Sequence, residues 1–283
     1  MFAEYKPYSL KIKNKPFAPE GPLVMGILNT TEDSFFDGGK YHTTDSALFR
    51  CEAMLNQGAG IIDIGGQSTR PGAEIQSSDE ELRRTVPIIT AIAARFPEAI
   101  LSIDTFRATV ARQAIEAGAC MVNDVSAGED DADMLQTVAS LQVPYIAMHK
   151  QGIPKTMQDN PQYRDVCTEV INYLDQRLAL MNRMGISDVI LDPGFGFGKT
   201  LEHNYSLLKH LNLFHTLNCP LLIGISRKSM VCKLLKTDPE HALNGSTALH
   251  MLALMQGAHI LRVHDVKEAV ECLRIASFIR SVS

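Results

Sequence analysis

Short apolar runs alternate with longer amphipathic stretches along almost the whole chain. The runs are rich in Ile, Val and Leu and have the length of single buried strands, whereas the intervening stretches place apolar residues at helical spacing. Eight such runs occur, at residues 24–29, 61–66, 100–105, 121–126, 143–149, 189–194, 220–226 and 259–265. This alternation predicts a parallel sheet covered by helices.

Cap residues mark the ends of several predicted helices. Ser78 with Glu81 predicts a capping box, and Asp238 before Pro239 predicts a helix start. Asp265 precedes the last amphipathic stretch. A glycine stands near the end of four predicted helices, namely Gly58, Gly118, Gly185 and Gly257. Eight strands alternating with eight helices predict a single (β/α)₈ TIM barrel of the α/β class, with an open doubly wound sheet as the alternative because periodicity does not reveal closure.

The barrel is expected to fill residues 23–283, and the 283-residue length fits because such barrels commonly have about 250 residues. Residues 1–22 belong to no strand–helix unit and are expected to form a short N-terminal extension. Its prolines, Pro16, Pro19 and Pro22, predict an extended segment over the bottom of the barrel.

Composition excludes several classes of protein. The chain is 45% hydrophobic and 21% charged with a net charge of -5, which suits a large globular core and disfavours an electrostatic nucleic-acid site. Its 6 cysteines include no C-x-x-C pair, so neither a zinc ribbon nor a disulfide framework is indicated. Neither a signal peptide nor a spanning segment is recognisable, so we expect a cytoplasmic protein that binds no nucleic acid and no membrane.

Polar residues end nearly every predicted strand, where a barrel binds its ligand. Asp104, Asn123 and Asp192 end the third, fourth and sixth strands. Two carboxylates and an amide suit a flat heterocycle with several N–H groups, such as a pterin or purine. Two alternatives are turn capping by the aspartates and metal ligation. The second is weaker because no His-x-His or Glu-x-x-His spacing accompanies the acids.

A second group is cationic or potentially so and comes from the ends of the second, seventh and eighth strands. It comprises Arg70, Lys228, Arg262 and His264. Loops after the last two strands of a barrel often bind phosphate, so a phosphorylated substrate is predicted. The alternative is that each arginine pairs with a nearby carboxylate. The run at residues 194–200 is not a P-loop, because Pro193 stands where the motif needs its first glycine.

Eight segments together resemble the dihydropteroate synthase family, the pterin-binding enzymes of folate biosynthesis. They are MGILNTTEDSFFDGG (25–39), IDIGGQSTRPGA (62–73), SIDT (102–105), NDVSAG (123–128), MHKQGIPKTMQ (148–158), LDPGFGFGKTLEHNYSLL (191–208), LIGISRKSM (222–230) and RVHDV (262–266). The resemblance implies a TIM barrel, expected as a homodimer, that condenses 6-hydroxymethyl-7,8-dihydropterin pyrophosphate with p-aminobenzoate. The products would be 7,8-dihydropteroate and pyrophosphate.

The resemblance also implies a role for each matching residue. Pterin would be held by Asp104, Asn123, Asp192 and Lys228. Pyrophosphate would be bound by Asn29, Thr69, Arg70, Arg262 and His264, with Mg²⁺ on Asn29. The p-aminobenzoate pocket would comprise Phe35, Thr69, Arg70, Pro71, Phe197 and Ser229. The catalytic groups would be Asp104, Lys228, Arg262 and His264.

The implied chemistry is assistance to a leaving group. Pyrophosphate departs when Mg²⁺ and fixed cations meet its growing charge, and the arylamine needs no strong general base. Four loop residues depart from the usual family strings, namely Glu32, Phe36, Gln67 and Lys150. Two other functions stay open: a related methyltransferase barrel that binds methyltetrahydrofolate, and a non-catalytic pterin-binding paralogue.

Overall fold

The computed structural model describes residues 3, 5–30, 43–67, 76–152 and 157–282. Its main sheet has 8 parallel strands in the order β8-β7-β6-β5-β4-β3-β10-β9. These are β3 (Leu23–Asn29), β4 (Ile61–Gly65), β5 (Leu101–Asp104), β6 (Met121–Asp124), β7 (Tyr145–Met148), β8 (Val189–Asp192), β9 (Leu222–Ile223) and β10 (Ile260–Val263). A parallel bridge between Leu191 and Leu221 joins the two ends of the sheet. The barrel prediction is confirmed, and the open-sheet alternative is wrong.

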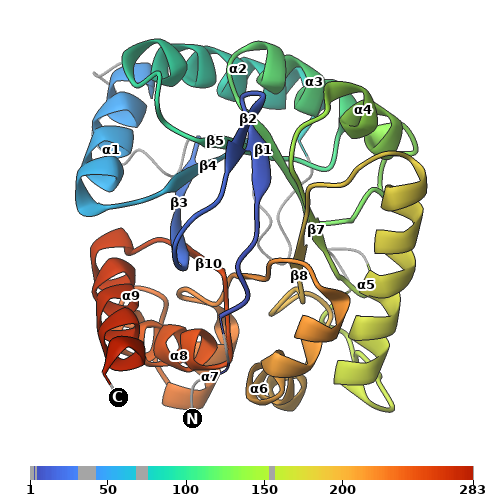
Figure 1. Cartoon of the computed structure of the whole chain (residues 1–283), viewed down its shortest axis with the longest axis vertical. Helices are drawn as coiled ribbons and strands as arrows, with labels where there is room; N and C mark the ends of the chain where they lie inside the picture. The colour runs from blue at the N-terminus through green and yellow to red at the C-terminus, as the bar shows by residue number, and fades with distance from the viewer. Residues whose placement is uncertain (1–2, 4, 31–42, 68–75, 153–156, 283) are drawn as a thin grey trace.

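Helices form a ring around the strands (Figure 1). They are α1 (Thr43–Gln57), α2 (Ser78–Arg95), α3 (Ala108–Glu116), α4 (Met134–Leu141), α5 (Val166–Arg183), α6 (Leu201–Lys209), the 3₁₀-helix η2 (Leu211–Leu217), α7 (Ser229–Leu235), α8 (Leu243–Met255) and α9 (Val266–Ser281). The main apolar core lies between this ring and the outer faces of the strands. None of the helices in the described part of the chain is long and apolar enough to cross a membrane.

Each predicted strand is present, but all except the first end one to three residues before the predicted boundary. The largest difference is β9, which has 2 residues where residues 220–226 were expected. The chain turns away because Arg227 adopts a left-handed backbone with φ 55° and Ser226 bonds to the next loop, where its Oγ lies 3.2 Å from the backbone N of His264. An apolar pattern cannot separate the polar end of a strand from the start of its loop.

Local end signals were partly correct. The four predicted terminal glycines all have positive φ, as expected where a helix ends. Two predicted starts were wrong. Ser77, not Ser78, caps α2 by accepting the N–H of Glu80 at 3.2 Å. Asp238 accepts the N–H of His241 at 3.0 Å and caps a single turn, whereas α8 starts later, at Leu243.

A hairpin closes the bottom of the barrel. Strands β1 (Leu10–Ile12) and β2 (Lys15–Phe17) pair in an antiparallel manner and lie across one end of the barrel (Figure 1). Two of its side chains join inward-facing residues of the barrel in one buried cluster, which comprises Leu10, Ile12, Met25, Ile61, Cys120, Met121, Ile146, Ile190, Leu222 and Ile260. The backbone N–H of Lys11 also donates to Asp188 Oδ2 at 3.0 Å, just before β8. This end is therefore filled by apolar side chains, which leaves the opposite end for ligands.

Candidate active site

The floor of the open end is a buried network of side chains from four strands. Arg262 on β10 donates from Nε to Asp63 Oδ2 at 2.6 Å and from Nη2 to Asp104 Oδ2 at 2.7 Å. Asn123 Nδ2 on β6 donates to the same Asp63 oxygen at 2.9 Å. Two of the predicted pterin-binding residues, Asp104 and Asn123, therefore share one network with the predicted phosphate-binding Arg262. The alternative that arginines pair with carboxylates is correct for Arg262, but the pair is buried inside the barrel mouth.

Burial sets the charge state of this floor. It raises the pKa of Asp104 to about 7, and the neighbouring Arg262 guanidinium opposes that rise. Burial alone would lower the pKa of Arg262, but the carboxylates of Asp63 and Asp104 hold it above its ordinary value. The network thus keeps a permanent cation beside a buried carboxyl group.

Asp192 and Lys228 lie next to each other beside this buried network. Asp192 Oδ1 accepts the N–H of Gly194 at 2.7 Å, so the turn-capping alternative is correct for this residue, while its other oxygen can accept from a ligand. Burial raises the pKa of Asp192. Lys228 Nζ donates to Phe195 O at 2.5 Å and lies 4.7 Å from the centroid of the Phe197 ring. Burial lowers the pKa of Lys228 to about 8, against the attraction of Asp192.

The loop after β8 is held by Lys199, a residue that sequence reasoning left without a role. Its Nζ donates to Gly194 O at 2.8 Å and to Phe197 O at 3.1 Å, and lies 2.9 Å from His149 Nδ1. Gly194 has φ 73°, and a Cβ there would lie 1.8 Å from His149 O, so only glycine fits. Burial lowers the pKa of Lys199 to about 7. Lys199 therefore fixes the loop that presents Phe197.

Asp63 was also missed. It is fully buried on β4 and accepts from both Asn123 and Arg262. The signal was present in the sequence, since Asp63 is a carboxylate within the apolar run at residues 61–66. A buried carboxylate requires compensating donors, which makes such a residue a candidate for a functional network.

The predicted phosphate-binding residues that the structure describes, Asn29, Arg262 and His264, lie at the same end of the barrel. Strand register places Asn29, Gly65 and Asp104 in one row on β3, β4 and β5. A Cβ at Gly65 would lie 3.8 Å from Asn29 Oδ1 and 3.6 Å from Asp104 Oδ2, so the glycine leaves the space between these oxygens open. His264 follows β10 and its Nδ1 lies 3.1 Å from Ser226 Oγ. Ser229 begins α7 and is exposed.

Several predicted residues lie outside the described part of the chain. They are Phe35, Thr69, Arg70 and Pro71 of the predicted pockets, together with Glu32 and Phe36 of the unusual loop positions. The other two unusual residues are described. Gln67 Oε1 accepts the N–H of Gln76 at 2.8 Å, and Lys150 Nζ lies 2.6 Å from Asp130 Oδ1. Within the described ranges, no group of three or more His, Cys, Asp or Glu side chains could hold a metal ion.

This arrangement can hold a flat, N–H-rich ring against buried carboxylates while cations meet an anionic substituent at the rim. Comparison with known proteins points to one family. The sequence model described as "Pterin binding enzyme" matches residues 25–264. A dihydropteroate synthase from Escherichia coli strain K12 is 50% identical over 257 residues, which are 90% of each chain.

Two solved structures extend the comparison. The Xanthomonas albilineans dihydropteroate synthase with 4-aminobenzoic acid has a TM-score of 0.92 and 40% identity, covering 98% of this chain and 100% of that one. The enzyme from the same organism in complex with 7,8-dihydropteroate has a TM-score of 0.89 and 37% identity over the same shares of the two chains. The chain therefore belongs to the dihydropteroate synthase family of pterin-binding enzymes.

Proposed function

We propose that the chain condenses 6-hydroxymethyl-7,8-dihydropterin pyrophosphate with p-aminobenzoate to give 7,8-dihydropteroate and pyrophosphate. One observation carries the proposal. The buried acceptors Asp104 and Asp192 share a barrel mouth with the cations Lys228 and Arg262 in a chain of this family. The names of its relatives, and the 4-aminobenzoic acid and dihydropteroate in their structures, support the same reaction.

The pterin ring would be held by hydrogen-bond acceptors and donors together. The carboxylates of Asp104 and Asp192 accept from ring N–H groups, and Asn123 and Lys228 offer donors to ring acceptors. Both carboxylates have raised pKa values because of burial, so hydrogen bonds from a bound ring would supply the stabilisation that water would otherwise give them. Their negative charge also favours the cationic methylene that forms as pyrophosphate leaves.

The leaving group is met by fixed cations. In the reaction the C–O bond between the methylene and pyrophosphate breaks, and the arylamine nitrogen forms the new C–N bond and then loses a proton. Arg262 donates two of its five N–H groups to Asp63 and Asp104, which leaves others for phosphate oxygens. His264 lies on the adjacent loop, where its imidazole can donate to a phosphate oxygen. The arylamine is nucleophilic as it stands, so no general base is assigned.

Mg²⁺ fits the donors at this site. The amide oxygen of Asn29 borders the space that Gly65 leaves open, and a hard cation prefers such oxygen ligands. Because Mg²⁺ usually takes one or two protein ligands together with substrate phosphates and water, a site with few acidic ligands suits it. When bound, the ion would neutralise charge on the pyrophosphate. Ser229 and Phe197 are proposed to meet p-aminobenzoate.

The direct test is turnover by the purified protein. We expect pyrophosphate and dihydropteroate to form in equal amounts from the two substrates, with little turnover when Mg²⁺ is chelated. Pterin binding without turnover would identify a non-catalytic paralogue, and methyl transfer from methyltetrahydrofolate would identify the other alternative. Asn29→Ala and His264→Ala should slow turnover more than they weaken binding of an unphosphorylated pterin, because their partner is the leaving group. Equal losses would contradict these roles.

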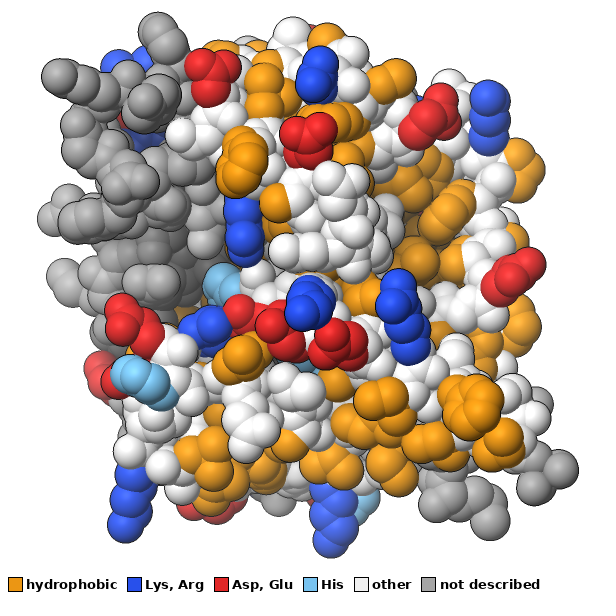
Figure 2. Space-filling model, turned by 90° about the vertical axis from the view of Figure 1, so that its left-hand side faces the viewer, with side chains coloured by type: hydrophobic (Ala, Val, Ile, Leu, Met, Phe, Trp, Pro, Cys, Tyr) orange, Lys and Arg blue, Asp and Glu red, His pale blue; other side chains and the backbone are white. Residues whose placement is uncertain are grey.

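A homodimer is proposed as the assembly. Ile275, Phe278 and Ile279 follow helical spacing on one stripe of α9 and are exposed, as is Val282 directly after the helix. Figure 2 shows hydrophobic side chains gathered on the lower part of the face that includes α9. Apolar stripes of this kind commonly mark subunit interfaces. Light scattering should give twice the chain mass, and Phe278→Glu should give a monomer; a wild-type monomer at micromolar concentration would contradict the proposal.

A cytoplasmic location and the absence of nucleic-acid and membrane partners remain predictions from the sequence. Cell fractionation tests the first, and we expect the chain in the cytoplasmic fraction. Sedimentation with nucleic acid or with vesicles tests the others, and we expect no cosedimentation.

A further inference from the structure

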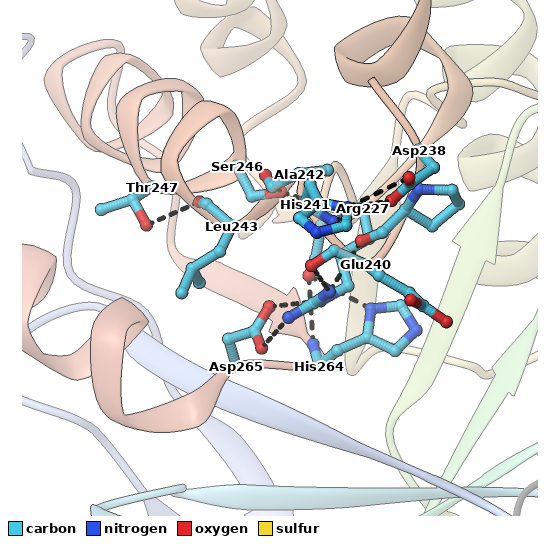
Figure 3. Close-up of polar contacts among 12 residues, drawn as sticks. Arg227, Asp238, Glu240, His241, Ala242, Leu243, Ser246, Thr247, His264 and Asp265 are labelled. Atoms are coloured by element: carbon cyan, nitrogen blue, oxygen red, sulfur yellow. Dashed lines mark hydrogen bonds and ion pairs between the residues drawn. The ribbon is translucent and has the colours of Figure 1, made fainter.

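The loops after β9 and β10 are tied together by one bidentate ion pair between Arg227 and Asp265, called the fork below. Arg227 donates from Nε to Asp265 Oδ2 at 2.8 Å and from Nη2 to Asp265 Oδ1 at 2.7 Å (Figure 3). Its Nη1 donates to the carbonyl oxygens of Pro239 and Glu240 at 2.7 and 2.9 Å. The side chain thus joins three segments of the chain, and these bonds use most of its donors.

The ion pair lies between residues assigned to the substrates. Lys228 follows Arg227 directly, and His264 directly precedes Asp265. Ser226 adds a second tie between the same loops, since its Oγ contacts both the backbone N and Nδ1 of His264 at 3.2 and 3.1 Å. Any shift of the fork would therefore move Lys228 relative to His264.

Arg227 and Asp265 each give up a locally favourable arrangement in forming the fork. Arg227 has φ 55°, a left-handed backbone that a non-glycine residue adopts with strain. Its backbone N–H is fixed in that state by Ser246 Oγ at 2.9 Å. Asp265 stands at the N-cap of α9, yet its side chain makes no capping bond to that helix. The carboxylate is used for Arg227 instead.

We propose that Arg227 and Asp265 are positioning residues, which hold the loops after β9 and β10 in register so that Lys228 and His264 act on one substrate. The proposal rests on the proposed function. Arg227 touches no substrate in this scheme, because its donors already serve Asp265 and the carbonyls of the segment at 239–240. The contrasting scheme makes Arg227 a direct ligand of phosphate.

A double-mutant cycle separates these schemes. Arg227→Gly keeps the left-handed backbone without strain and removes the fork, while Asp265→Asn keeps the shape of its partner. If the pair acts as a unit, each single variant should lower kcat at least about tenfold, and the double variant should lose no more than either single one. The affinity for an unphosphorylated pterin should fall less than the affinity for pyrophosphate, because Asp104, Asn123 and Asp192 lie on other strands and only Lys228 among the pterin residues adjoins the ion pair.

Inorganic pyrophosphate with Mg²⁺ is the second probe. Under the positioning scheme both single variants bind it more weakly to a similar extent. If Arg227 were a direct ligand, Arg227→Gly would weaken binding whereas Asp265→Asn would preserve or strengthen it, since the guanidinium would be released. That pattern, or kcat values near wild type in both variants, would overturn the proposal.

Controls distinguish positioning from general destabilisation. Arg84→Ala removes another arginine–carboxylate pair, in which Nε lies 2.5 Å from Glu80 Oε1 on α2, and should leave kcat unchanged. Arg227→Lys keeps the charge but cannot form the fork, so it should lose most of the activity that Arg227→Gly loses; wild-type kcat in Arg227→Lys would refute the fork. Thermal unfolding checks that every variant is folded. An inactive wild-type chain would refute the proposed function, whereas equal pyrophosphate affinity in all variants would refute this inference.

Discussion

The two ends of the barrel bury different kinds of side chain, apolar at the bottom and polar or charged at the mouth. At the bottom, the hairpin and the strands bury Leu10, Ile12, Ile146 and Ile190 against one another. At the mouth, the same strands continue into Asp63, Asp104, Asn123 and Asp192, which are buried to a similar extent. Burial of an apolar side chain stabilises the fold by about 1.5–3 kcal/mol, whereas a buried ion pair is often neutral or costly. The difference suggests that one end is devoted to stability and the other to binding.

The largest expected effect is at the bottom. Ile190→Ala should lower the free energy of unfolding by about 2–5 kcal/mol, because it removes buried methyl groups and leaves a cavity in the apolar cluster that closes the bottom of the barrel. Urea denaturation measures this loss. Pterin affinity should stay within about twofold of wild type, since the site is at the other end. Leu213→Ala, at an exposed position, serves as the control, and a parallel loss of pterin affinity in Ile190→Ala would show that the two ends are coupled.

The opposite pattern is expected at the mouth. Asp192→Asn should weaken pterin binding by about 1.5–3 kcal/mol, because a charge-assisted acceptor becomes a neutral one. Stability should be unchanged or higher, since burial raises the pKa of Asp192 and the fold therefore opposes its charged form. Calorimetry and thermal unfolding measure the two effects. Asp188→Asn at the bottom should leave pterin affinity intact; if Asp192→Asn instead lowered stability and kept affinity, the division between the ends would fail.

The same division explains what the sequence could predict. Strands and helices follow from apolar periodicity, and polar residues at strand ends indicated the mouth, so the fold and Asp104, Asn123 and Asp192 could be located. Distances between strands do not follow from periodicity. That Arg262 bonds to Asp63 and Asp104 depends on barrel closure, which brings residues 199 and 158 positions apart into contact.

Loop geometry was the other gap. The role of Lys199 depends on the close approach of Gly194 to His149 O, which no local pattern encodes. Arg227 was visible only as one of three polar residues after the seventh strand, and its fork to Asp265 requires the paired loops. Asp265 was expected simply to precede the last helix. Such residues support a site through tertiary contacts, so they escape motif-based reasoning.

A smaller effect concerns the seam where the barrel closes. Burial lowers the pKa of His259 to about 4. The Nδ1 atom of His259 accepts the N–H of Leu221, the residue that forms the parallel bridge to Leu191. Around the ring lie Tyr5, Tyr8 and His215 at centroid distances of 5.4, 5.3 and 5.6 Å, and its Nε2 bonds to Lys6 O.

Protonation of this histidine should weaken the fold. The folded pKa lies below the unfolded value near 6.5, so its stabilisation is complete above pH 6.5 and is lost as pH falls toward 4. Between pH 7 and 5 we expect a loss of about 1–2 kcal/mol from this group, measured by urea denaturation. His259→Gln should flatten that slope, while His241→Gln at an exposed position should not. If the free energy of unfolding of His259→Gln depended on pH as steeply as that of the wild type, His259 would not be the source of the acid sensitivity.

The smallest effect is expected at the rim of the mouth, where Lys150 is an unusual residue for the family strings. Its amine lies 2.6 Å from Asp130 Oδ1, so its charge is neutralised by a neighbour before it can act on a substrate. Lys150→Met should therefore lower stability by less than about 1 kcal/mol, and less still at high salt, because the Asp130 partner is partly exposed to solvent and methionine can replace the packing of the lysine stem. The KM for p-aminobenzoate should stay within about twofold, and Asp130→Asn should behave alike because it breaks the same pair. Thermal unfolding at two salt concentrations and steady-state kinetics measure these values. A tenfold change in KM for Lys150→Met alone would place a binding residue on the rim, and substrate binding would then extend beyond the buried floor.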